Sequence, residues 1–287
     1  MSVYLQVFLP LAMFLMMFII GTDLVLDDFR LVMKSPSRVL IATTGQLIGL
    51  PFLACILAFV LRPDVILVVG LLVTAAAPGG GISNIITARL KGNTALSVTL
   101  TAISSVACLI TMPIVFALMF MALSMNDSTF GVPALPIVAQ LLLLLLLPVL
   151  SGMYVRYKAE RYWYRYRRKL HSFNSILLVI VIVYSLTLDE GLSKADFIAA
   201  LPLAGAFLMV CWMSGYCFAR LMKVTRKDRI ALEVEFLLRS GAVPSMIIVT
   251  VFQRIEWLAF PAAYVFLQLS LALLLVLVYR LRAAAEH

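Results

Sequence analysis

A series of long apolar runs constrains this chain more than any other feature of its sequence. Polar clusters bound nine such runs, at approximately 3–22, 38–61, 65–88, 94–123, 133–155, 171–188, 196–219, 231–253 and 257–279. A helix needs about 20 apolar residues to cross the hydrocarbon core of a bilayer. Because only 13% of the residues are charged and 63% are hydrophobic, a water-soluble domain is excluded. The sequence predicts an all-α polytopic membrane protein.

The basic residues indicate how the runs are oriented. Nineteen of the 23 Lys and Arg residues fall in alternate connections and the tail, whereas three fall on the opposite side. The positive-inside rule then places the N-terminus outside and the C-terminus in the cytoplasm, in a multi-pass protein of the inner or plasma membrane. The basic and aromatic stretch at 154–168 is interpreted as an anchor at the lipid headgroups. Membrane lipid is therefore an expected partner and nucleic acid is not.

Two of the runs contain helix-breaking residues in their middle. The third holds Pro-Gly-Gly-Gly at 78–81, and the eighth holds Ser-Gly at 240–241 with Pro244 soon after. Each glycine costs roughly 1 kcal/mol in a helix relative to alanine. We expect unwound segments at 78–81 and near 235–244, although ordinary proline kinks are an alternative.

The positions of the two breaks suggest an internal repeat. Residues 124–287 form a five-helix unit with its fourth helix broken, and residues 1–123 form the same unit without its first helix. Units with an odd number of helices have opposite orientations, which is the inverted-repeat arrangement of secondary transporters. Matching broken helices are a sequence signal for a transport site.

Three charged residues lie inside the eighth run, where charge is costly and usually functional. They are Glu233, Glu235 and Arg239. Glu235 and Arg239 have helical i, i+4 spacing, so a structural ion pair is one interpretation. Glu233 lies one turn nearer the cytoplasm, where it can reach water.

The third and fourth runs supply oxygen-bearing side chains of the kind that hard cations bind. They are Ser83, Asn84, Ser97, Thr101, Ser104 and Ser105. Interhelical packing is the alternative role for such hydroxyl groups. The backbone amides of Gly79, Gly80 and Gly81 and the half-helix at 82–90 present a positive dipole end that favours an anion.

Three stretches, 45–51, 78–104 and 233–241, resemble the bile acid:sodium symporter family in its nine-helix form. The resemblance implies an inverted-repeat transporter with a core domain, a panel domain and two crossed discontinuous helices. It also implies one Na⁺ site made by Ser83, Asn84, Ser97, Thr101 and Glu235. In an alternative register Glu233 takes the place of Glu235.

A second Na⁺ site of the family matches less well. Gln46 corresponds to one ligand, but Arg239 and Ser240 stand where the family has Gln-Asn. The resemblance therefore implies one Na⁺ and leaves the second open. The residues expected to face the substrate are Gly79, Gly80, Gly81, Arg239 and Ser240.

The predicted function is secondary active transport, namely sodium-coupled symport of an organic anion that is bile-acid-like or a small carboxylate. A proton-linked or cation-independent transporter in which Arg239 replaces a sodium is the alternative on the same fold. A membrane receptor or sensor and an intramembrane enzyme are more distant alternatives. The sequence has no His-Glu-x-x-His motif and no visible nucleophile–base pair, so we do not expect an enzyme. Neither the substrate nor the oligomeric state can be read from the residues.

The expected topology can be tested by cysteine labelling from either side of the membrane. Cysteines introduced at position 2 and in the C-terminal tail should react from opposite sides, because nine spans place the termini on opposite faces. Labelling of both positions from the same side would contradict the nine-span arrangement.

Overall fold

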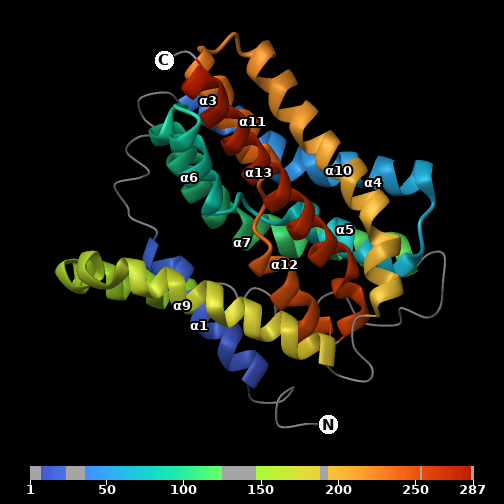
Figure 1. The fold of residues 1–287 in the computed structure, drawn as a ribbon. Helices are drawn as coiled ribbons and strands as arrows, with labels where there is room; N and C mark the ends of the chain where they lie inside the picture. The colour runs from blue at the N-terminus through green and yellow to red at the C-terminus, as the bar shows by residue number, and fades with distance from the viewer. Residues whose placement is uncertain (1–7, 24–35, 125–146, 188–192, 253, 286–287) are drawn as a thin grey trace.

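The computed structural model describes residues 8–23, 36–124, 147–187, 193–252 and 254–285, and these are helical apart from short connections (Figure 1). The elements are α1 (Leu9–Asp23), α3 (Pro36–Thr44), the π-helix η2 (Gly45–Gly49), α4 (Leu50–Leu61), α5 (Val65–Ala76), α6 (Ile82–Arg89), α7 (Thr94–Ser124), α9 (Glu160–Thr187), α10 (Lys194–Leu221), α11 (Arg226–Leu237), α12 (Ala242–Ile247), the π-helix η4 (Ile248–Phe252), the 3₁₀ helix η5 (Ile255–Leu258) and α13 (Ala259–Ala285).

Four of the described helical segments are long and apolar enough to cross a membrane. They are Ser37–Leu61, Thr94–Leu118, Lys194–Leu221 and Ile255–Val278. The prediction of an all-α membrane protein is confirmed. Residues 3–7 of the first expected run and 133–146 of the fifth lie outside the described residues.

The sixth expected run differs most from the structure, because α9 begins at Glu160 rather than near residue 171. Part of the stretch that we interpreted as a membrane-edge anchor is therefore helical. Arg156 contacts the first turn of α9. Its guanidinium carbon lies 3.4 Å from the ring centroid of Trp163, and its Nη2 lies 3.8 Å from the Glu160 carboxylate. Helix-favouring Arg, Lys and Leu residues then extend the helix.

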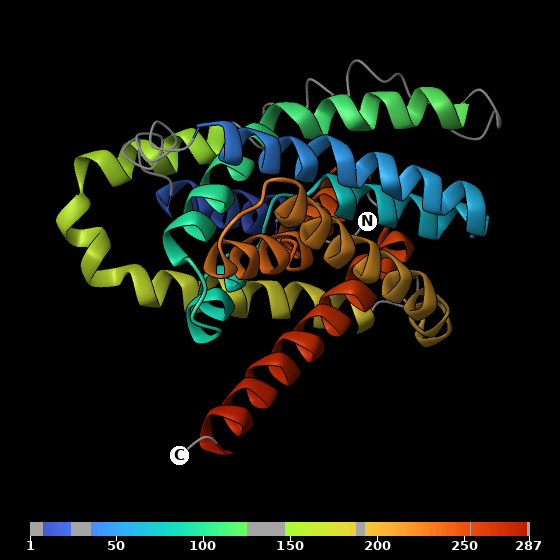
Figure 2. The same ribbon diagram turned by 90° about the horizontal axis from the view of Figure 1, so that it is seen from above.

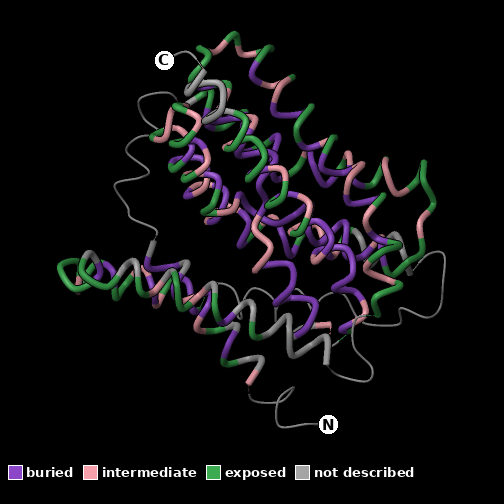
Figure 3. Tube along the Cα trace, viewed as in Figure 1, coloured by how far each residue is buried: buried purple, intermediate pink, exposed green. Residues whose placement is uncertain are grey.

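The helices form two groups in the view of Figure 1. Helices α1 and α9 lie side by side along one edge, and α10 packs along both α11 and α13. Seen from above, the C-terminal part of α13 projects beyond the other helices (Figure 2). Buried residues concentrate in the interior of the molecule (Figure 3), and most residues of α5, α11 and α12 are among them.

Two helices are interrupted, one between α5 and α6 and the other between α11 and α12. The intervening residues, 77–81 and 238–241, are called the crossing segments here, because they pass each other antiparallel. The N–H of Gly80 donates to the carbonyl of Leu238 at 2.8 Å, and the N–H of Ser240 donates to that of Pro78 at 2.9 Å. Backbone groups within a bilayer must find partners in the protein, and each crossing segment supplies them to the other.

A second set of hydrogen bonds joins the α6–α7 connection to the start of α11, on the side that the sequence predicts to be cytoplasmic. Asn93, in the connection from α6 to α7, donates through Nδ2 to Asp228 Oδ1 at 2.7 Å, and its N–H reaches the Lys227 carbonyl at 2.9 Å. Thr225 caps the start of α11 by accepting from the Asp228 N–H at 3.3 Å. The first turn of α11 is thereby fixed against the end of α6.

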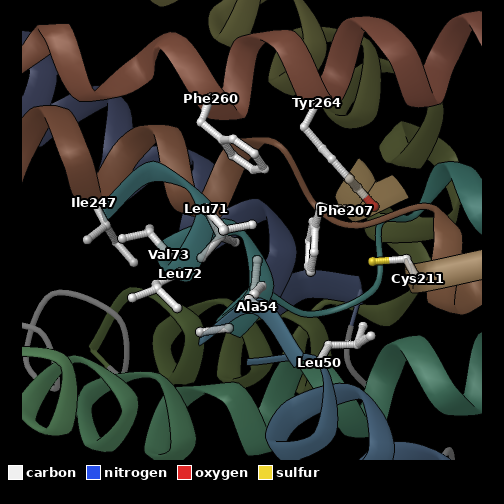
Figure 4. Close-up of a cluster of buried hydrophobic side chains, with 14 of the residues drawn as sticks. Leu50, Ala54, Leu71, Leu72, Val73, Phe207, Cys211, Ile247, Phe260 and Tyr264 are labelled. Atoms are coloured by element: carbon white, nitrogen blue, oxygen red, sulfur yellow. The ribbon is translucent and has the colours of Figure 1, made fainter. Parts of the chain in front are cut away.

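Aromatic side chains of α10 and α13 pack near the C-terminal end of α11 (Figure 4). The ring centroid of Phe207 on α10 lies 5.6 Å from that of Tyr264 and 6.2 Å from that of Phe260, both on α13. The Tyr264 hydroxyl donates to the carbonyl of Leu237, the last residue of α11, at 2.8 Å. A helix end that would otherwise leave a free carbonyl is satisfied in this way.

The three consecutive glycines do not have equal room. A Cβ on Gly79 would collide with the carboxylate of Glu235, and one on Gly80 would lie 3.1 Å from the Arg239 carbonyl oxygen. A Cβ on Gly81 would meet nothing within 4 Å. Gly79 therefore leaves room for the Glu235 carboxylate and Gly80 for the backbone of the other crossing segment, whereas Gly81 is not restricted in this way.

We expect Gly79→Ala to lower the thermal stability of the purified protein, since overpacking of a buried site costs about 1–3 kcal/mol. Gly81→Ala is the matched control, because the φ of −56° at Gly81 suits any residue and the space around it is open. Thermal unfolding in detergent compares the two. Equal melting temperatures for both variants would contradict the close contact between Gly79 and the Glu235 carboxylate.

Candidate functional site

Glu235 is the centre of the most polar buried region of the structure. It lies near the end of α11 and is fully buried. Its carboxylate accepts hydrogen bonds from Ser83 Oγ at 2.5 Å, Thr101 Oγ1 at 2.7 Å and Ser97 Oγ at 3.1 Å. Ser83 is in the first turn of α6, and the other two residues are one turn apart on α7. The crossing thus brings a carboxylate among hydroxyl groups that are more than 130 residues away in the sequence.

Asn84 completes this group of oxygen atoms. Its Oδ1 accepts from Ser97 Oγ at 2.8 Å and lies 3.4 Å from Thr101 Oγ1. Asn84 and Thr101 are half-buried, whereas Ser83, Ser97 and Glu235 are buried. The side-chain oxygens of these five residues are called the oxygen cluster here. One carboxylate with neutral hydroxyl and amide oxygens is a ligand set that suits a hard cation.

Glu233 lies outside the oxygen cluster. It is half-buried and forms an ion pair with Arg229, one turn earlier on α11, at 3.5 Å. Of the two carboxylates considered from the sequence, the structure therefore brings Glu235 to the hydroxyl groups.

The structural ion pair between Glu235 and Arg239, one interpretation of the sequence, is not formed. Because α11 ends at Leu237, the two residues do not share a helix face. Arg239 Nη2 instead donates to the carbonyls of Ala75, at 3.0 Å, of Ala77, and of Gln46, at 3.4 Å. The first two carbonyls belong to the C-terminal end of α5, which is the negative end of its dipole.

Gln46 also lies apart from the oxygen cluster, in the π-helix between α3 and α4. It is fully buried, and neither atom of its side-chain amide has a hydrogen-bond partner among the described protein atoms. Its contact with Arg239 is made by its backbone carbonyl.

Gln268 on α13 is a residue that sequence reasoning missed. Its Oε1 accepts from the Arg239 N–H and its Nε2 donates to the Arg239 carbonyl, both at 3.0 Å. The side chain thus pairs with the backbone of a crossing segment as a neighbouring strand would. An amide in the middle of an apolar run was the available signal, because such side chains hydrogen-bond between membrane helices.

Two of the three amides that the sequence predicts to face an anion donate to acceptors within the protein. The N–H of Gly79 donates to Ser104 Oγ at 3.4 Å, and the N–H of Gly80 is paired within the crossing. Unwound backbone at membrane depth is satisfied by the protein itself. Gly81, which is exposed at the start of α6, is the one of the three that remains open.

Ser240 was likewise expected to face the substrate. It is half-buried, its N–H is paired with Pro78, and its hydroxyl lies 3.5 Å from the N–H of Val243. Its main interactions are therefore within the crossing and the start of α12.

Comparison with known proteins identifies the family of the chain. The profile of the Sodium Bile acid symporter family matches residues 10–193, which is more than half of the 287-residue chain. The chain belongs to this family. It is therefore an integral membrane protein, and the family and the similar proteins found with it are transporters rather than enzymes.

Several relatives resemble this member of the Sodium Bile acid symporter family at low identity. The "Uncharacterized sodium-dependent transporter YocS" of Bacillus subtilis (strain 168) is 26% identical over 82% of this chain and 70% of its own length. The human "Sodium-dependent organic anion transporter" is 26% identical over 93% of this chain and 71% of its own. The "Sodium/bile acid cotransporter 4" of Rattus norvegicus is 28% identical over 76% of this chain, but the matched region is only half of that protein.

Gln268→Leu should destabilise the protein, because it leaves the buried N–H and carbonyl of Arg239 without partners. Each unsatisfied buried group costs about 1–3 kcal/mol. Ser270→Ala is the control on the same helix, since its exposed hydroxyl bonds only to the preceding turn of α13. A thermal unfolding midpoint in Gln268→Leu as high as in Ser270→Ala would show that Gln268 does not hold the crossing segment.

Proposed function

We propose that this protein imports an organic anion by sodium-coupled symport and that the oxygen cluster binds the sodium ion. The observation that carries the proposal is the environment of Glu235. This fully buried carboxylate faces hydroxyl and amide oxygens and forms no ion pair with a basic side chain among the described residues. A buried charge of this kind needs a counter-charge, and the names of the bacterial and human relatives point to sodium.

The hydrogen-bond count in the cluster also favours a cation. Ser97 and Thr101 each have a single hydroxyl proton, and each hydroxyl lies within 3.4 Å of both Asn84 Oδ1 and a Glu235 oxygen. One proton cannot serve two acceptors fully. A cation among these oxygens would satisfy the lone pairs that the hydroxyl protons cannot.

Sodium binding would also couple to the conformation of the transporter. The oxygen cluster draws Glu235 from the proposed second repeat, 124–287, and its other members from the proposed first repeat, 1–123. An ion that binds both sides favours the state in which the two crossing segments are together, and this population shift is the basis of coupling. In the proposed core-and-panel arrangement, the substrate anion would meet Gly81 and the first turn of α6, which is the positive end of the helix dipole.

The proposal is tested with purified protein in proteoliposomes, using radiolabelled cholate and a panel of small carboxylates. An inward sodium gradient should drive uptake of at least one of them, and choline in place of sodium should not. Uptake that continues in choline, or that follows a proton gradient alone, would instead support the cation-independent or proton-linked transporter.

Two substitutions test the ligands themselves. Asn84→Ala and Thr101→Ala each remove one oxygen and little volume, and we expect each to weaken sodium binding about tenfold or more. Thr99→Ala is the matched control, since the Thr99 hydroxyl bonds to the Ala95 carbonyl of its own helix. Sodium-dependent thermal stabilisation reports binding without knowledge of the substrate. An unchanged sodium response in both cluster variants would mean that Asn84 and Thr101 serve interhelical packing and do not bind sodium.

A further inference from the structure

Backbone carbonyls from two different elements converge on the guanidinium of Arg239. Two of them, from Ala75 and Ala77, are at the end of α5, and the third is that of Gln46 in the π-helix between α3 and α4. The C-terminal end of a helix carries partial negative charge and unpaired carbonyls. Carbonyl oxygens that converge at such an end are a site for a cation by their chemistry.

Among the described residues, no carboxylate forms an ion pair with the guanidinium of Arg239. Arg239 is almost fully buried, at 1% exposure, and it forms no ion pair with any described residue. Its Nε and Nη1 have no protein partner within the described part of the chain, and neither does the adjacent Gln46 amide. The guanidinium is therefore held by carbonyl dipoles, as a free cation would be.

The backbone that carries this charge is fixed on both sides. Gln268 pairs with the N–H and the carbonyl of Arg239, and the neighbouring residues of the crossing segment bond to Pro78 and Gly80. A guanidinium remains protonated under all ordinary conditions. The charge can neither dissociate nor be exchanged with solvent while the crossing is intact.

We propose that Arg239 is a tethered cation that fills a second, carbonyl-lined cation site and so limits each transport cycle to one sodium ion. The inference rests on the proposed function, because it assumes that the oxygen cluster binds the first. A sodium ion could not join the guanidinium at the same carbonyls, since two like charges in a low-dielectric site repel strongly. Only the oxygen cluster is then left to exchange its ion with solvent.

The experiment compares four proteins: the wild type, Thr101→Ala, Arg239→Gln and the double variant Thr101→Ala/Arg239→Gln. Each is purified, and its thermal stability is measured against sodium at constant ionic strength with choline as the replacement. Arg239→Gln keeps a polar side chain but removes the charge from the carbonyls. Arg229→Gln, which removes a half-exposed arginine from α11, is the control for loss of a positive charge.

We expect the wild type and Arg229→Gln to respond to sodium with a Hill slope of about one, as a single site requires. Thr101→Ala should lose that response. Arg239→Gln should be less stable than the wild type in choline and should gain a second sodium-dependent component. The double variant should keep this second component, because the carbonyl site does not include Thr101.

The outcomes separate the two proposals. A normal sodium response in Thr101→Ala would contradict the oxygen cluster as the first site. If Thr101→Ala loses its response and the double variant also shows none, the tethered-cation inference is overturned while the proposed function stands. An Arg239→Gln protein that is stable only in sodium supports the inference.

A variant that is unstable in both salts overturns it, because the vacated carbonyls then do not accept sodium. Arg239→Lys keeps a tethered charge and should remain a one-site protein. A second sodium-dependent component in the lysine variant would contradict the inference, because sodium would then bind although a tethered charge fills the carbonyl-lined site.

Discussion

The antiparallel pairing of the two crossing segments is the interaction on which the rest of the structure depends. Its hydrogen bonds, Gly80 to Leu238 and Ser240 to Pro78, satisfy the backbone that two broken helices expose at membrane depth. Gly80 lies against the backbone of the other segment, and the missing side chain at Gly79 leaves room for Glu235, whose carboxylate meets the hydroxyl groups of α6 and α7. The oxygen cluster is therefore a consequence of how the segments cross.

The crossing also separates two opposite charges that are close in sequence. Glu235 remains on α11 and faces hydroxyl groups, whereas Arg239 lies beyond the helix end and faces the carbonyls of α5. An intact helix would have put them on one face as an ion pair. With the helix broken, we propose that the carboxylate stays available for a mobile ion while the guanidinium acts as a fixed one.

The sequence predicts those features that follow from local chemistry. Apolar runs, the proline-glycine break and the one-turn spacing of Ser97 and Thr101 are patterns along the chain, and the structure shows helices, interruptions and a shared face at these places. The partners of the Gly79 and Gly80 amides could not be predicted, because they belong to α7 and to the other crossing segment. Gln268 was missed for the same reason, since its role appears only when α13 packs beside residue 239.

Equilibrium binding of ²²Na⁺ to the purified protein tests most directly whether the crossing builds an ion site. We predict saturable binding of one sodium ion per chain, because the oxygen cluster is open to exchange and the carbonyl site is filled by Arg239. The absence of saturable binding would contradict the assignment of the oxygen cluster as a sodium site. Binding of two sodium ions per chain would contradict the assignment of Arg239 as the tethered cation that fills the carbonyl-lined site.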